Sequence, residues 1–332
     1  MSLHQRRTAM TVLAAVACGL ALMGTVPASG TSDGRATVAR PIAGCQVFPE
    51  NNYWNADISG LPRHASSDAW LRHMSPRSKL HPDFGRAFSA QPVPYGIPIT
   101  VVGGGHRRVN VGFTYGRESD QVRYPFGSDT KIEGGARSDG DRHAIVVDKS
   151  RCRLYETWNT RKRDGRWHAG SGAVWDLGSN ALRHDGWTSA DAAGLPILPG
   201  LLRWNEVRKG KVDHAIRFTT DVTDRRYVWP ARHQAGSVNN RRYPPMGARF
   251  RLKASYDLTQ FSPRTRVVLR AMQHYGLVLA DNGSPWYFQG AASAKWPNKL
   301  ISELKLVPAR AFVAVDTSSL MVDPDSARVH TG

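Results

Sequence analysis

Short runs of β-branched, aliphatic and aromatic residues recur along most of the chain, and Gly, Pro, Asp and Asn residues separate them. β-Strands favour these side chains and end where turn residues begin. Strands do not alternate regularly with helical segments, which argues against a doubly wound fold. We expect strands at residues 97–102, 108–115, 143–148, 152–159, 166–176, 212–220, 226–231, 248–254, 277–281, 286–289 and 311–316.

Helical signals are few. The clearest helix is expected to start at Pro263, with Ser262 as its N-cap, and to stop before Gly276. Shorter helices are expected at 67–74 and 298–306. Because no linker-like stretch divides residues 42–332, we expect a single β-rich domain there, a β-sandwich or jelly roll with a few short helices.

Residues 1–28 have the organisation of a secretory signal peptide. A basic Arg6-Arg7 pair precedes an apolar run, and Val26-Pro27-Ala28 provides small residues for cleavage after Ala28. A twin-arginine signal is the alternative interpretation of the same pair. Residues 29–41 are small and polar, which predicts a flexible lead-in. No second long apolar run follows, so we expect secretion and no membrane span after cleavage.

Cleavage would leave two cysteines, Cys45 and Cys152. In an exported protein an even pair predicts one disulfide. It would close a loop of about 108 residues, which stabilises a fold by up to ~4–5 kcal/mol in the chain-entropy model. We expect it to tie the N-terminal segment to a central strand.

The formal net charge is +18, and +16 without Arg6 and Arg7. A charge of this size attracts anionic surfaces, such as acidic polysaccharides, cell-wall polymers, extracellular DNA or anionic lipid. An arginine-rich composition that serves only solubility is the alternative. The chain has no recognisable nucleic-acid-binding motif.

Several well-known catalytic motifs are absent. The sequence has no G-x-S-x-G, no H-E-x-x-H, no P-loop and no G-x-G-x-x-G after a strand. A zinc site from the central histidines with Asp141 or Asp176 would lack the tight ligand spacing of known sites. We therefore expect neither a metal nor another cofactor.

The densest polar and aromatic stretch runs from Asp139 to His233. Strand alternation places Glu156 between Leu154 and Trp158 on an apolar face, where a carboxylate needs a partner or a raised pKa. Glu156 and Asp176, which ends an apolar strand, are the first acid/base or nucleophile pair. A structural ion pair of Glu156 with an arginine is the alternative.

Further candidates lie in the same stretch. Trp next to Asp or Asn suits a sugar, because the ring covers the C–H face and the polar groups bind hydroxyls. The other catalytic candidates are Asp191, His143 and His214. The substrate-binding candidates are Trp175, Trp187, Arg217, Trp229 and His233.

Five segments carry a family resemblance. They are Phe48-Pro49-Glu50-Asn51-Asn52-Tyr53-Trp54-Asn55, Gly140-Asp141-Arg142-His143, residues 171–197, His214-Ala215-Ile216-Arg217-Phe218-Thr219 and Ala280-Asp281-Asn282-Gly283. In these segments the chain resembles a group of secreted actinobacterial proteins of unassigned function. The resemblance implies one domain and secretion, and it carries over no activity and no catalytic residue.

These observations favour a secreted carbohydrate-active enzyme, a glycoside hydrolase or a polysaccharide lyase, that cleaves a neutral or acidic extracellular polysaccharide. The alternatives are a non-catalytic cell-wall or glycan-binding protein, and a secreted phosphodiesterase or nuclease. The sequence makes no prediction of substrate identity or oligomeric state.

Overall fold

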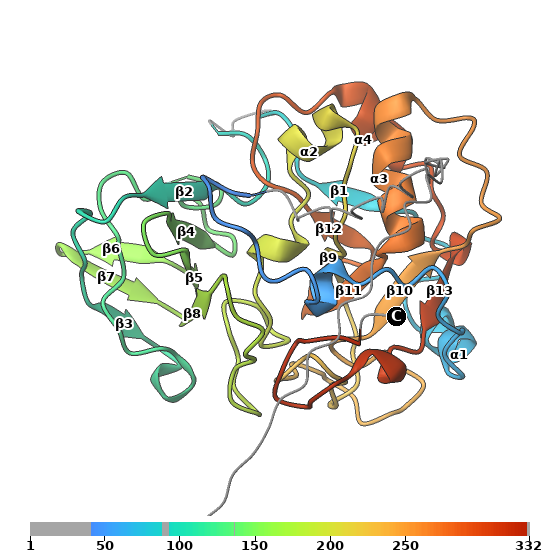
Figure 1. The fold of residues 1–332 in the computed structure, drawn as a ribbon, viewed down its shortest axis with the longest axis horizontal. Coiled ribbons are helices and arrows are strands. Elements are labelled where there is room, and N and C mark those ends of the chain that lie inside the picture. Colours follow the sequence, from blue (N-terminus) through green and yellow to red (C-terminus); the bar gives the residue numbers. More distant parts are fainter. Residues whose placement is uncertain (1–40, 88–92, 136, 331–332) are drawn as a thin grey trace, which may run out of the picture. The chain divides into compact units, whose positions relative to one another are not determined.

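The three sheets of this protein account for most of its regular structure (Figure 1). The computed structural model describes residues 41–87, 93–135 and 137–330, which belong to one compact unit. Within these ranges the fold is mainly β with a few short helices, so the expected fold class is confirmed. The signal peptide expected at 1–28 and nearly all of the 29–41 lead-in lie outside the described residues.

The six-stranded sheet is mixed. Its central strands β9 and β11 are parallel, while β10 is antiparallel to both of its neighbours. Its core combines aliphatic side chains with buried aromatic rings, among them Phe218, Phe250 and Trp286. In spatial order the strands are β1 (His81–Asp83), β12 (Tyr287–Gln289), β9 (Ile216–Thr220), β11 (Leu277–Asn282), β10 (Arg249–Leu252) and β13 (Phe312–Val315).

Helix α3 (Pro263–His274) joins β10 to β11 and buries Val268, Leu269 and Met272 against this sheet. Pro263 is its first residue and Gly276 follows its end with a φ of 70°, as the sequence predicts. The other helices are α1 (Ser67–Arg72), α2 (Trp204–Lys209) and α4 (Asn298–Leu304). Single 3-10 turns lie at Tyr53–Asn55, Gly116–Glu118, Leu198–Gly200, Ala309–Ala311 and Ser318–Leu320. None of the helices in the described ranges is long and apolar enough to cross a membrane.

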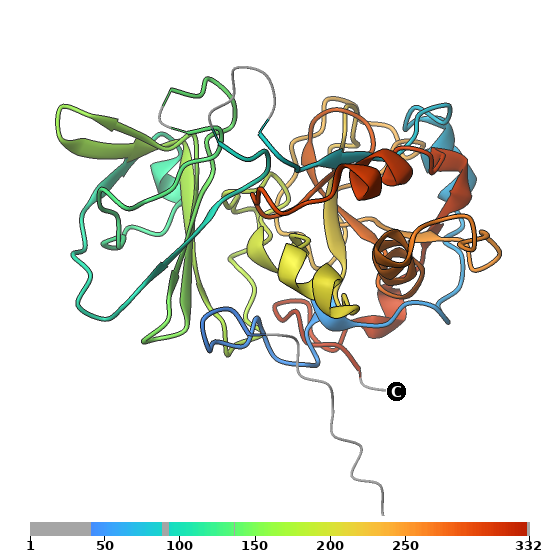
Figure 2. The ribbon, with the colours of Figure 1, turned by 90° about the horizontal axis from the view of Figure 1, so that it is seen from above.

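Two smaller sheets are formed by the middle of the chain, drawn in green in Figures 1 and 2. The four-stranded sheet contains β2 (Ile99–Val102), β4 (Ala144–Asp148), β5 (Arg153–Trp158) and β8 (Ser171–Asp176), in that order. The three-stranded sheet contains β3 (Val111–Phe113), β7 (Arg166–Ala169) and β6 (Arg161–Arg163), in that order. The antiparallel strands β4 and β5 form a hairpin that turns at residues 149–152.

The predicted disulfide is confirmed. Cys45 and Cys152 are bonded, with their Cα atoms 5.3 Å apart. Both cysteines pack with the core of the four-stranded sheet, so the bond ties the first described segment to the start of β5.

One expected strand is absent and another is divided. Residues 226–231 form only an isolated bridge at Tyr227, because Pro230 has no N–H for a ladder and the Trp229 side chain bonds the Ser326 carbonyl. The segment 166–176 is split at Gly170 into β7 and β8. A Cβ at Gly170 would lie 2.1 Å from the ring of Trp158, so this position needs glycine. No pattern in the sequence predicts β1, β6 or α2.

Candidate functional site

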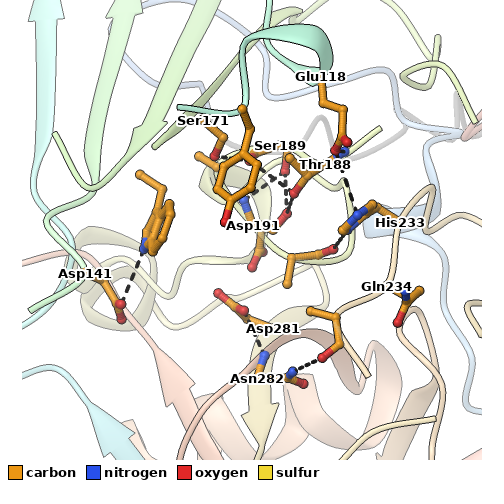
Figure 3. A pocket seen from close by; sticks show the side chains of 15 residues that line it. Glu118, Asp141, Ser171, Thr188, Ser189, Asp191, His233, Gln234, Asp281 and Asn282 are labelled. Atoms are coloured by element: carbon orange, nitrogen blue, oxygen red, sulfur yellow. Dashed lines mark hydrogen bonds and ion pairs between the residues drawn. The ribbon is translucent and has the colours of Figure 1, made fainter. Parts of the chain in front are cut away.

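A cavity of about 510 Å³ lies where the ends of β5, β8 and β11 meet the loops around residues 118, 190 and 234 (Figure 3). Carboxyl groups are prominent in its lining, and aromatic rings and amides accompany them. The carboxyl groups are those of Glu118, Asp141, Asp191 and Asp281. The rings and amides are those of Tyr115, Trp158, His233, Gln234 and Asn282.

A buried ion pair forms the floor of this cavity. The Nε and Nη2 atoms of Arg217 donate to the two carboxylate oxygens of Asp191, at 2.9 and 2.5 Å. Neither side chain is more than 2% exposed. Although burial opposes the charge of Arg217, the Asp191 carboxylate raises the pKa of the guanidinium. Asp191 is therefore an anion fixed in position, with both of its oxygens bound.

Asp281 is the second carboxyl group at the floor. Its Oδ2 lies 3.5 Å from Nη2 of Arg217, it hydrogen-bonds Asp191, and its side chain is 25% exposed. Figure 3 shows the side chains of Asp191 and Asp281 pointing toward one another. Burial and the neighbouring Asp191 carboxylate raise the pKa of Asp281 to about 8. Asp281 therefore carries a proton at neutral pH and faces the cavity.

A β-bulge puts Asp281 in this place. Along the β9–β11 pair, Leu279 lies opposite Phe218 but Asp281 lies opposite Thr219, so β11 has one extra residue between them. Cross-strand neighbours share a face of the sheet, and Thr219 shares its face with Arg217. Without the extra residue, Asp281 would point to the opposite face. Bulges commonly re-aim a side chain next to a functional site.

The interior behind the cavity holds more acids than bases. Two cations, Arg217 and His143, neutralise the two carboxylates of Asp191 and Glu133. Burial alone would lower the pKa of His143, but Glu133 at 2.7 Å raises it to about 9. Burial alone would raise the pKa of Glu133, but the His143 imidazolium holds it below its usual value.

The pKa values of three carboxyl groups in this network are raised. Burial raises the pKa of Asp83 despite its hydrogen bond from Tyr95, and it raises the pKa of Glu156 to about 7. Asp281 is the third. Neither Asp83 nor Glu156 lines the cavity. Among the described residues, Asp281 is therefore the one carboxyl group that both has a raised pKa and lines the cavity. It can deliver a proton to a molecule bound there.

The structure does not bring the first predicted catalytic pair together. Glu156 lies opposite Ala173 and Asp176 lies opposite Arg153, so the two carboxyls point to opposite faces of the four-stranded sheet. Glu156 is completely buried, and its two oxygens accept the backbone N–H groups of Ile197 and Leu198 at 2.9 and 2.8 Å. Asp176 is half exposed and lies 3.7 Å from the guanidinium of Arg153.

The two other predicted histidines of the catalytic set are also buried away from the cavity. His143 bonds Glu133 through Nδ1 and the Ala190 carbonyl through Nε2 at 3.2 Å, so both ring nitrogens are occupied. His214 bonds its neighbouring carbonyl of Ala215 at 2.7 Å and approaches Glu206 at 3.4 Å. Of the five predicted catalytic residues, Asp191 alone lines the cavity.

Of the predicted substrate-binding residues, His233 alone lines the cavity, and Arg217 lies directly behind it. His233 donates its Nδ1–H to the Ala192 carbonyl at 2.8 Å, and its Nε2 lies 3.9 Å from Glu118. The three predicted tryptophans are elsewhere. Trp175 and Trp187 contact the guanidinium of Arg183, and Trp229 packs on the ring of Tyr53.

Sequence reasoning missed several residues that line the cavity. Asp281 ends one expected strand, Glu118 follows another, and Trp158 lies on the apolar face that holds Glu156, but none of the three is a site candidate from the sequence. The polar character of Asp281-Asn282 directly after a buried strand was the one available signal. Glu118 carried none, because its place depends on contacts with residues about 70 positions away, such as the Thr188 N–H at 3.3 Å.

The described side chains do not include a group of three or more His, Cys, Asp or Glu residues arranged to hold a metal ion. Comparisons with protein-family models, with curated proteins and with solved structures found no match. The cavity combines a protonated carboxyl, Asp281, with further carboxyl groups and with aromatic rings.

Proposed function

We propose that this protein is a glycoside hydrolase with Asp281 as its general acid. The observation that carries the proposal is the raised pKa of Asp281 in a position that lines the cavity. A glycosidase needs a carboxyl group that is still protonated near neutral pH, together with a second carboxylate across the bond to be cleaved.

Glu118 is the carboxylate that we assign as the second group. Its side chain is 37% exposed, the Thr188 N–H orients it, and His233 lies beside it. Figure 3 shows Glu118 and Asp281 at different sides of the cavity. Asp281 would donate its proton to the glycosidic oxygen as the bond from that oxygen to the anomeric carbon breaks. Glu118 would accept a proton from the water that attacks the anomeric carbon.

The remaining lining suits a sugar ring. The rings of Tyr115 and Trp158 lie 6.4 Å apart and offer apolar faces to the C–H side of a pyranose. The amides of Gln234 and Asn282 supply donors and acceptors for hydroxyl groups. The Trp158 indole is itself held by Asp141, whose Oδ1 accepts its N–H at 3.5 Å.

The cavity favours hydrolysis over elimination. A lyase that acts on a uronate needs a cation to neutralise the sugar carboxylate. No Lys or Arg lines the cavity in the described part of the chain, and the Nε and Nη2 atoms of Arg217, which lies behind it, are bound to Asp191. We therefore propose a neutral sugar at the point of cleavage.

We also propose that the protein acts outside the cell. The Cys45–Cys152 disulfide supports this, because such bonds persist in oxidising compartments. The signal-peptide pattern of residues 1–28 supports it independently.

The test is product release from a panel of neutral and acidic polysaccharides by the purified protein, without residues 1–28. We expect new reducing ends without the ultraviolet absorbance of an unsaturated sugar. Absorbance in step with the reducing ends would establish a lyase and contradict the hydrolase. If folded protein releases no product from any polysaccharide of the panel but binds one of them, the protein is a non-catalytic glycan-binding protein instead.

Two variants test the assignment of the second carboxylate. Glu118→Gln should lose activity by about 10²–10⁴-fold, the usual contribution of a general base. Asp141→Asn is the matched control in the same cavity, and it should keep most of the activity. If Asp141→Asn lost much more activity than Glu118→Gln, the general base would be Asp141 and not Glu118.

A further inference from the structure

One face of the β6–β7 hairpin is strongly basic. The register pairs Arg161 with His168 and Arg163 with Arg166, and cross-strand partners share a face of the sheet. The other face carries Trp167, which is buried. We call Arg161, Arg163, Arg166 and His168 the basic face. Figure 1 labels the two strands, and the turn that joins them is Asp164-Gly165, with positive φ at both residues as in tight hairpins.

These side chains lack carboxylate partners in the part of the chain that the structure describes. Among the described residues, no Asp or Glu lies within ion-pair distance of Arg163, Arg166 or His168, and the Nε of Arg161 bonds only the Asn159 amide oxygen, at 3.0 Å. Asp164, in the turn, is the one acid of the hairpin. Two arginines directly opposite each other repel, which weakens a strand pair unless an anion lies between them.

A second cavity borders the same hairpin. It has a volume of about 770 Å³ and is lined by Arg166 and His168 together with Arg107 and Lys162. The one acid in its lining, Asp129, is bound to His106 at 3.1 Å. The ammonium group of Lys162 lies over the Trp167 ring, 5.8 Å from its centre. This cavity is therefore a hollow of positive charge that is distinct from the acidic cavity at Asp281.

We propose that the basic face and this second cavity bind a stretch of an anionic polysaccharide. The positively charged side chains along this short exposed hairpin can each pair with one of the carboxylates that repeat along an acidic glycan chain. Single-stranded nucleic acid needs aromatic platforms on which bases stack, and the Trp167 indole of this hairpin is only 7% exposed. Affinity for duplex DNA grows with the number of phosphates that a protein neutralises, and the basic residues of this surface are few.

The inference stands independently of hydrolysis at Asp281. The surface would hold the protein on an acidic matrix, while the bond that is cleaved lies in the other cavity. Loss of one property need not change the other, so the two proposals fail separately.

The test compares two charge-matched variants. Arg161→Gln/Arg163→Gln/Arg166→Gln alters the basic face. Arg225→Gln/Arg241→Gln/Arg242→Gln removes the same net charge from exposed arginines elsewhere. Binding to immobilised polygalacturonate, with pullulan as the neutral reference, is measured at low and at physiological ionic strength.

We expect the wild type to bind polygalacturonate in a salt-sensitive manner and not to bind pullulan through this surface. The basic-face variant should bind about tenfold more weakly or worse, and the control variant nearly as well as the wild type. Equal losses in both variants would mean that net charge alone acts, and would overturn the proposal. Tighter binding to duplex DNA than to polygalacturonate, lost in the basic-face variant, would overturn the choice of a glycan.

Discussion

Arg217 binds both carboxylate oxygens of Asp191, at 2.9 and 2.5 Å, with almost no exposure of either side chain. This pair fixes the charge at the floor of the cavity. Burial disfavours a charge on the adjacent Asp281, and the nearby Asp191 carboxylate adds to this effect, so the pKa of Asp281 is raised and it keeps its proton at neutral pH. The proposed chemistry depends on this relationship.

The Arg217–Asp191 pair should also dominate local stability. Arg217→Lys is expected to lower the free energy of unfolding by about 3–5 kcal/mol, since a lysine cannot span both oxygens and leaves a buried carboxylate poorly paired. Urea unfolding measures this loss. Arg153→Gln is the matched control, because Arg153 pairs with Asp176 at the surface and such pairs contribute about 0–1 kcal/mol. Equal stability of the two variants would contradict the structural role of Arg217.

The pH dependence of activity follows from Asp281. A general acid works only while protonated, and the pKa of Asp281 is raised to about 8. Activity should therefore persist through neutral pH and fall as the pH rises through about 8. A profile of kcat/KM against pH, on the substrate identified by the panel, measures this loss of activity at high pH. A fall that begins in the usual range of an aspartic acid, near pH 4, would exclude Asp281 as the acid.

Glu156 should prove structural. In Glu156→Gln the amide nitrogen cannot accept a hydrogen bond, so the N–H of Ile197 or Leu198 is left without its acceptor. A buried unsatisfied donor costs about 1–3 kcal/mol, and thermal unfolding should reveal the loss. Asp176→Asn should leave both stability and activity nearly unchanged, because Asp176 is half exposed. Intact stability with abolished activity in Glu156→Gln would restore Glu156 as the catalytic acid.

The disulfide should contribute strongly to stability. Cys45 and Cys152 are 107 positions apart, and closing so long a loop in the unfolded chain is worth up to ~4–5 kcal/mol in the chain-entropy model. Unfolding midpoints of the oxidised protein and of Cys45→Ala/Cys152→Ala measure it. No difference between them would mean that the unfolded chain keeps these segments together without the bond.

Local patterns predicted much of the fold. Alternation and turn residues identified most of the strands, and Ser262-Pro263 with Gly276 located α3. Sequence patterns cannot assign strands to sheets, because pairs such as β9 with β11 join segments about 60 residues apart. β6 was missed because its Arg-Lys-Arg run has the composition of a loop, and residues 226–231 were overpredicted because composition outweighed Pro230.

The candidate site was predicted less well, and for an identifiable reason. Asp191 and His233 were named because they lie in a polar stretch near aromatic residues. Strict alternation would place Asp281 on the opposite face of β11, and only the bulge brings it beside Arg217. Glu156 was favoured because it is a carboxylate among apolar residues. That pattern correctly predicted a buried acid with a raised pKa, but not the backbone N–H groups that hold it.

The most direct test of the central claim is the rate of reducing-end release by Asp281→Asn on the polysaccharide that the wild type cleaves, near neutral pH. The amide resembles the protonated carboxyl in shape and charge, so the variant should unfold at nearly the same urea concentration as the wild type. Its rate should be lower by about 10²–10⁴-fold, because it has no proton to give. A folded Asp281→Asn variant that releases reducing ends as fast as the wild type would contradict the assignment of this cavity as the catalytic site.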